Sequence, residues 1–98
     1  MEFDWDEGKR RANLAKHGLD FTRAAELFAG PVLETEDARR NYLERRIIAI
    51  GAAAGQVLAC VYTDRVAADG RLLRRIISLR PASREERAVY ADYTRPPA

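Results

Sequence analysis

Three strand-like runs joined by short turns occupy the centre of this chain. Apolar and β-branched residues dominate these runs, which span residues 45–52, 56–64 and 71–80. Such short turns join antiparallel neighbours, because parallel strands need a crossover of a dozen or more residues. The pattern therefore predicts an antiparallel meander, with the first turn at Ala53-Ala54-Gly55. A shorter run over residues 32–36 predicts a fourth strand at an edge of the sheet.

Capping residues mark two helices before the strands. Asp6 is a good N-cap and Gly18 suits a left-handed C-terminal position, which together predict a helix over residues 7–17. Asp20 caps a second helix whose apolar residues recur at i, i+3, i+4 and i+7. This helix is expected to end at Gly30, which proline follows.

A third helix is predicted after the last strand. Ser83 and Glu86 have the spacing of a capping box, which predicts a helix over residues 84–93. The predicted order is therefore ααββββα, an α+β domain with its helices packed on one mainly antiparallel sheet. We expect residues 1–93 to form this single domain and residues 94–98, which contain two prolines, to be a flexible tail.

Composition narrows the class of protein. The chain has 98 residues, a net charge of +2 and 47% hydrophobic residues, which favours one folded domain. Residues 1–37 carry nine acidic and five basic residues, whereas residues 38–98 carry six acidic and twelve basic ones. The lone Cys60 suits a reducing compartment, and no apolar run reaches membrane-spanning length, so we expect a cytoplasmic protein. One histidine and one cysteine give no metal-ligand spacing, and we expect no cofactor.

The last predicted strand carries three arginines. Strict alternation would give it two faces, with Leu73, Arg75, Ile77 and Leu79 on one and Arg74, Ile76, Ser78 and Arg80 on the other. The second face then presents two guanidinium groups and a hydroxyl. The guanidinium group is a planar fork of donors that suits phosphate oxygens. We therefore expect this sheet face to bind an anionic partner such as RNA.

Short motifs follow one another in order from Phe3 to Tyr90. They are Phe3-Asp4-Trp5-Asp6 with Lys9; Asn13-Leu14-Ala15-Lys16-His17-Gly18; Phe21 with Ala25; Asp37, Tyr42, Glu44, Arg46 and Gly51; Arg75-Ile76-Ile77-Ser78 with Arg80 and Ala82; and Ser83, Glu86 and Tyr90. This ordered set resembles the BrnT-type toxins of bacterial type II toxin–antitoxin systems. Two positions depart from the family pattern, because Leu43 replaces a glycine and Pro81 replaces a basic residue.

The resemblance implies a fold, an activity and a partner. The fold is that of RelE-like toxins, which agrees with the order predicted from the sequence. The activity is endoribonuclease cleavage that inhibits translation and growth. The partner is a small antitoxin with a ribbon-helix-helix DNA-binding domain, whose other segment would cover the arginine-bearing face. Such a complex would contact operator DNA mainly through the antitoxin.

RNA cleavage without a metal requires a base for the 2′-hydroxyl, cations for the phosphate and an acid for the leaving oxygen. We predict Arg46, Arg80 and then Arg75 as phosphate-binding groups, and Glu44 as the base or an orienting carboxylate. Structural alternatives exist for each of these residues. Glu44 and Arg46 could form a solvated ion pair, Arg80 could pair with Glu86, and Arg75 could be buried against a carboxylate.

Four further residues are candidates for RNA binding: Lys9, Tyr62, Ser78 and Tyr90. Tyr62 could stack on a base or be a half-buried strand residue, and Tyr90 could pack on the sheet. His17, at a predicted helix end, suits a structural position better than a catalytic one. A non-catalytic RNA- or protein-binding module is the alternative function. The sequence leaves open the general base and acid, the cleavage preference, ribosome dependence and the stoichiometry of the complex.

Overall fold

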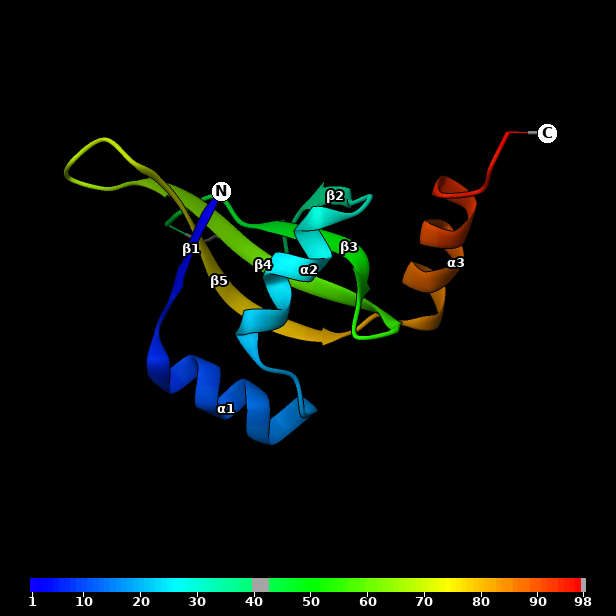
Figure 1. Ribbon diagram of the computed structural model, residues 1–98, viewed down its shortest axis with the longest axis horizontal. Coiled ribbons are helices and arrows are strands. Elements are labelled where there is room, and N and C mark those ends of the chain that lie inside the picture. Colours follow the sequence, from blue (N-terminus) through cyan, green and yellow to red (C-terminus); the bar gives the residue numbers. More distant parts are fainter. Residues whose placement is uncertain (40–42, 98) are drawn as a thin grey trace.

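The computed structural model describes residues 1–39 and 43–97, which form an α+β fold with three α-helices and a five-stranded sheet (Figure 1). The elements in chain order are β1 (Glu2–Trp5), α1 (Glu7–His17), the 3₁₀ turn η1 (Phe21–Arg23), α2 (Ala24–Ala29), β2 (Leu33–Glu36), β3 (Ile47–Ala53), β4 (Gln56–Val66), β5 (Leu72–Pro81) and α3 (Arg84–Tyr93). No helix in the described part of the chain is both long enough and apolar enough to cross a membrane.

The helix ends confirm the capping predictions. The Asp6 side chain accepts a 2.9 Å hydrogen bond from the Lys9 amide, and Gly18 ends α1 with a φ of 69°. Both bonds of the predicted capping box are present at the start of α3. The second helix differs from the prediction, because the chain first forms η1 behind Asp20 and then only six residues of α2.

The sheet has the strand order β1-β5-β4-β3-β2, with β2 at an edge as predicted. The predicted order ααββββα is wrong at its start, because β1 precedes α1 and pairs with β5 in parallel. Glu2-Phe3-Asp4-Trp5 alternates polar and apolar residues, which is the strand signal that the prediction missed. Phe3 and Trp5 of this strand are partly buried and pack against the core.

The β3–β4 hairpin turns where the sequence predicted it. Ala53 pairs with Gln56, so Ala54 and Gly55 form a two-residue loop. Their φ angles are 53° and 75°, and this pair of positive values is that of a type I′ turn. The right-handed twist of this turn matches that of the strands it joins.

A β-bulge in β5 changes which arginines share a face. Ser78 pairs with Val61 and Ile76 pairs with Tyr62, so Ile77 is an extra residue between them. Strict alternation across residues 73–80 is therefore wrong. The bulge shifts the side chains by one position, which puts Arg74, Ile76 and Leu79 on one face and Arg75, Ser78 and Arg80 on the other.

The two faces of the sheet carry separate apolar clusters. The face against α2, which we call the α2 face, holds the main core with Phe21, Leu27, Leu58, Cys60, Ile76 and Leu79 fully buried. The opposite face, which we call the α3 face, holds a smaller cluster of Ile50, Ala59 and Tyr90. Gly51 lets α2 approach the sheet closely, because a Cβ there would lie 2.8 Å from Leu27 Cγ.

Asn13 completes the edge of β5 beyond the end of β1. Its amide nitrogen donates to the Leu79 carbonyl (2.8 Å) and its amide oxygen accepts from the Leu79 amide (3.1 Å). The same nitrogen also donates to the Leu19 carbonyl (3.0 Å). One buried side chain on α1 therefore satisfies backbone groups that a neighbouring strand would otherwise satisfy.

Candidate active site

The α3 face presents three rows of side chains that run across the strands. The rows, read from the pairing register, are Asp4, Arg75 and Thr63; Ser78, Val61, Ile48 and Thr35; and Arg80, Ala59, Ile50 and Leu33. Successive rows lie about 7 Å apart, because two strand residues rise by that length. The first and third rows each contain an arginine, and the Ser78 row lies between them.

Arg75 is held by Asp4, a residue that the sequence analysis did not select. Arg75 Nη2 lies 3.6 Å from Asp4 Oδ2, and the two side chains are 31% and 33% exposed. Arg75 Nε and Asp4 Oδ1 are buried, and neither makes a hydrogen bond within the described residues. The pair therefore orients the arginine without using all of its donors. The alternation in residues 2–5 is the signal that could have placed Asp4 beside β5.

Arg80 forms a two-pronged ion pair with Glu86 at the start of α3. Arg80 Nη1 and Nη2 donate to Glu86 Oε1 and Oε2 at 2.7 Å and 3.0 Å. Glu86 Oε1 also accepts from the Ser83 amide as part of the capping box (2.8 Å). Hydrogen bonds from Arg80, with the Ser83 amide and coulombic attraction adding to them, lower the pKa of Glu86 to about 2. Glu86 is therefore ionised at neutral pH and fixes the direction of the guanidinium.

Glu44 and Arg46 precede β3. The strand begins at Ile47, so neither residue belongs to it. Glu44 is exposed, and its Oε1 lies 3.5 Å from Arg46 Nη2, which is the predicted ion pair. Tyr42 lies outside the described residues.

The segment that carries Arg46 is tied to β4. Thr63 Oγ1 donates a 2.7 Å hydrogen bond to the Arg45 carbonyl, and Ile47 pairs with Tyr62, the neighbour of Thr63. Thr63 itself pairs with Arg75 in the first row. Its bond to the Arg45 carbonyl therefore brings the backbone of residues 45 and 46 to the Thr63 end of that row. The structure therefore puts Arg46 at the end of the row of Arg75, with Arg80 two rows away. Glu44 instead lines a pocket together with Ile47, Tyr62, Thr63 and Asp64.

Arg74 and Tyr62 lie on the α2 face, away from these groups. Arg74 Nε and Nη2 donate to both carboxylate oxygens of Asp64 at 2.8 Å and 2.9 Å. The Arg74 guanidinium also stacks on the Tyr62 and Phe28 rings, 4.1 Å and 4.7 Å from their centroids. Tyr62 is 3% exposed and its hydroxyl donates to Glu34. Burial, followed by this hydrogen bond, raises the pKa of Tyr62.

The other predicted RNA-binding residues are spread over two regions. Lys9 is exposed on α1, where a groove of about 320 Å³ joins α1 to the bulge of β5. The groove is lined by Lys9, Ala12, Asn13, Lys16, His17, Ile77 and Ser78. Tyr90 is instead buried on the α3 face, and its hydroxyl donates to the Pro31 carbonyl (2.8 Å).

Residues of the types that bind metals or act as nucleophiles are dispersed. In residues 1–39 and 43–97, no three His, Cys, Asp or Glu side chains form a group that could hold a metal ion. Cys60 is fully buried on the α2 face, and this burial raises the pKa of its thiol to about 12. It packs as a small apolar residue.

Comparison with known protein families assigns the chain to one of them. Residues 5–86 match the family described as "Ribonuclease toxin, BrnT, of type II toxin-antitoxin system". The match covers most of the chain, so the protein belongs to the BrnT family, and the resemblance noted in its motifs is confirmed. The protein is thus a ribonuclease toxin, with RNA as its substrate and a cognate antitoxin as its partner. No curated protein sequence matches the chain.

Proposed function

We propose that this toxin is a metal-independent endoribonuclease whose substrate backbone crosses the α3 face of the sheet. The observation that carries the proposal is the bulge at Ile77, which brings Arg75, Ser78 and Arg80 onto one face. Arg46 enters the same face from the start of β3. Several guanidinium groups on one rigid sheet suit a phosphate whose negative charge increases during reaction.

The proposed reaction is in-line attack of a ribose 2′-oxygen on the adjacent phosphorus. The bond from the 2′-oxygen to phosphorus forms as the bond to the 5′-oxygen breaks, which leaves a 2′,3′-cyclic phosphate and a 5′-hydroxyl. A base takes the 2′-hydroxyl proton and an acid gives a proton to the 5′-oxygen. Arg75 and Arg46 bind the reacting phosphate in this scheme, and Arg80 stabilises charge on the same or the adjacent phosphate.

Glu44 is the proposed base or orienting group. It is the exposed carboxylate paired with Arg46, and it lies just before the start of β3. Glu86 does not take this role in the proposal, because its low pKa makes it a poor proton acceptor at neutral pH. Its role is to position Arg80.

The RNA backbone is proposed to continue from Ser78 onto α1. Lys9, Lys16 and His17 line the groove there, and none of them makes an ion pair with another described residue. Lysine side chains without a carboxylate partner are available to bind phosphates and release counterions. Tyr62 and Tyr90 are left out of this path, because their rings are buried in the two apolar clusters.

The proposal includes the biological setting implied by the family. Cleavage of RNA would inhibit translation and growth, and the fold would be that of RelE-like toxins. The cognate antitoxin would carry a ribbon-helix-helix DNA-binding domain and neutralise the toxin. Operator DNA would then be bound mainly by the antitoxin.

Cleavage of a 5′-labelled single-stranded RNA in EDTA tests the reaction. Arg80→Ala is expected to lower the rate by about 10²–10³-fold, as for the loss of one donor that stabilises transition-state charge. Arg95→Ala is the matched control, because it removes an equal charge from an exposed ion pair with Asp92. Products of the wild type should end in 2′,3′-cyclic phosphate. Cleavage that stops in EDTA, or that Arg80→Ala leaves unchanged, would contradict the proposal.

A second candidate is a non-catalytic RNA- or protein-binding module. The observation that favours it is that Arg75 and Arg80 each already have a carboxylate partner, for which a phosphate must compete. Such a module would show salt-sensitive RNA binding by a folded wild type and no products. Binding with cleavage would instead exclude it.

A further inference from the structure

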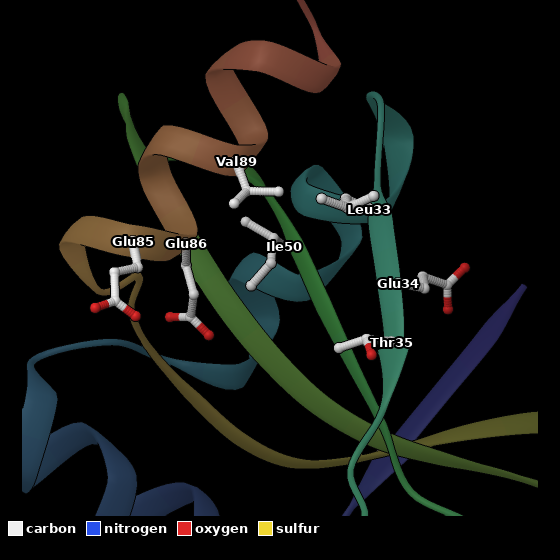
Figure 2. A pocket seen from close by; sticks show the side chains of 7 residues that line it. All are labelled: Leu33, Glu34, Thr35, Ile50, Glu85, Glu86 and Val89. Carbon is white, nitrogen blue, oxygen red and sulfur yellow. The ribbon is translucent and has the colours of Figure 1, made fainter.

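An apolar groove on the α3 face lies between α3 and the edge strand β2 (Figure 2). It has a volume of about 320 Å³ and is lined by Leu33, Glu34, Thr35, Ile50, Glu85, Glu86 and Val89. Figure 2 shows Ile50 between the two walls, with Val89 reaching toward it from α3 and Leu33 and Thr35 pointing in from β2. Val89 is 56% exposed although it is apolar. An apolar side chain left open beside a preformed groove is typical of a binding surface.

The charges around the groove exclude RNA as its occupant. Glu85 and Glu86 stand at one end, and Glu34 lies on the outer side of β2. Glu86 is neutralised by Arg80, but Glu85 has no ion-pair partner among the described residues. An anionic backbone would be repelled here, whereas a peptide with apolar side chains and neighbouring lysine or arginine would be complementary.

We propose that this groove binds an amphipathic segment of the cognate antitoxin. Apolar side chains of the segment would cover Ile50 and Val89, and a basic side chain would pair with Glu85. The outer edge of β2 is also unpaired in the described sheet, so an extended part of the segment can hydrogen-bond to it. The inference builds on the partner that family membership gives and adds the surface that receives it.

The position of the groove explains how such binding would inhibit the toxin. Leu33 and Ile50 belong to the same row as Arg80, and Thr35 belongs to the next row, which contains Ser78. A segment seated in the groove therefore lies beside the proposed path of RNA. It also lies against Glu86, the partner of Arg80, and would keep that ion pair closed. This part of the inference rests on the proposed function, whereas the binding itself does not.

Val89→Asp tests the docking surface. We expect it to weaken binding to the purified cognate antitoxin by at least about tenfold, because it buries a charge in the apolar centre of the interface. Val66→Asp is the matched control, since Val66 is 70% exposed at the far end of β4 and makes the same change. Isothermal titration calorimetry measures both variants against the wild type, and circular dichroism checks that each is folded.

The outcomes separate docking from catalysis. Weaker antitoxin binding by Val89→Asp alone, with RNA cleavage by the free toxin unchanged, supports the proposal. Wild-type affinity in Val89→Asp, or an equal loss in Val66→Asp, overturns it. A free toxin that is dimeric in solution and becomes monomeric in Val89→Asp would make a second toxin chain the occupant and also overturn it. Because calorimetry requires no cleavage, a failure of the proposed reaction would leave this result interpretable.

A charge substitution provides a second readout. Glu85→Lys is expected to lower antitoxin affinity and to weaken its dependence on salt, because an opposite-charge contact becomes a like-charge one. Glu2→Lys, which changes an exposed carboxylate at the other edge of the sheet, is the control and should leave affinity unchanged. Equal effects of the two substitutions would show that only net charge matters and would contradict a contact at Glu85.

Discussion

Two consecutive arginines on β5 occupy opposite faces of the sheet and have different surroundings. Arg74 on the α2 face donates two hydrogen bonds to Asp64 and stacks on two aromatic rings. Arg75 on the α3 face has one longer contact with Asp4 and a buried Nε that makes no hydrogen bond within the described residues. The comparison shows that the residue type does not determine the role. The role depends instead on how many hydrogen-bond donors of the guanidinium are already bonded to other side chains of the protein.

The same contrast holds for the two faces as a whole. On the α2 face, side chains from β1, η1, α2 and the central strands close around large apolar residues, so polar groups there serve packing. On the α3 face, small residues and short polar ones separate the arginines, and α3 covers only one end (Figure 1). We therefore expect substitutions on the α2 face to change stability and those on the α3 face to change activity.

The largest expected effect is on catalysis at Arg75. Arg75→Ala should lower the cleavage rate per folded molecule by about 10²–10³-fold, because a positioned donor to the phosphate is lost. Arg75→Lys keeps the charge but loses the planar guanidinium that can donate two hydrogen bonds to one phosphate, and it should recover only part of the rate. Rates are measured on labelled RNA and normalised to the folded fraction from circular dichroism. Full activity in Arg75→Ala would contradict the expectation that substitutions on the α3 face change activity.

Asn13→Ala is expected to cost about 2–3 kcal/mol of unfolding free energy, because it leaves buried backbone groups of β5 without partners. Those groups are the Leu79 amide and carbonyl, just past the bulge. Urea unfolding followed by Trp5 fluorescence measures the change. Leu14→Ala, on the exposed side of the same helix, is the control and should change stability far less. A loss below about 0.5 kcal/mol, the level of ordinary surface substitutions, would show that Asn13 does not hold this strand.

Arg74→Ala should lower the unfolding free energy by about 1–3 kcal/mol while leaving cleavage per folded molecule unchanged. The loss combines a two-pronged ion pair that is partly buried with stacking on two rings. The same urea titration and RNA assay measure the two quantities. A selective loss of cleavage without destabilisation would place Arg74 in the active site and reverse the comparison with Arg75.

The smallest expected effect is the pH dependence given by Glu86. Its pKa falls from an ordinary value of 4.5 to about 2 in the folded protein, chiefly because Arg80 donates to it. The ionised carboxylate therefore stabilises the fold above pH 4.5, and this contribution disappears as pH falls through about 2. Its size should be about 1 kcal/mol, because solvent screens a partly exposed pair.

Glu86→Gln cannot ionise, so its stability deficit relative to wild type should be full at pH 6 and nearly gone at about pH 2. Chemical unfolding at a series of pH values measures this difference. Glu85→Gln is the matched control, because Glu85 lies on the same helical turn without an arginine partner among the described residues. A deficit that does not vary with pH would mean that the Arg80 pair is not what stabilises this end of the sheet.

The sequence predicted elements whose signals are local. The bounds of α1 and α3 are as predicted because Asp6, Gly18, Ser83 and Glu86 satisfy the backbone at the helix ends. The β3–β4 hairpin was predictable for the same reason, from a turn of small residues between two apolar runs. Prediction failed where the decisive interaction is distant in sequence.

Two such failures affected the candidate site. No residue in the run from Arg74 to Arg80 marks Ile77 as a bulge, because its presence follows from how β4 pairs on both sides of it. The four residues of β1 are too few to specify a strand without β5 beside them. Their omission hid Asp4, and the missed bulge assigned Arg75 to the wrong face. The sequence could therefore name candidate residues, but not which of them share a face of the sheet.

The parallel pairing of β1 with β5 also constrains how the toxin folds. Glu2 lies beside Leu73, so most of the chain must be synthesised before the first strand finds its neighbour. Closing so long a loop costs entropy and slows folding relative to hairpins whose partners are close in sequence. Asp4 and Arg75 therefore meet late, after the β3–β4 hairpin can already form. A nascent or truncated chain that lacks β5 would carry Asp4 and Arg46 but neither Arg75 nor Arg80, so it would lack two of the proposed phosphate-binding groups.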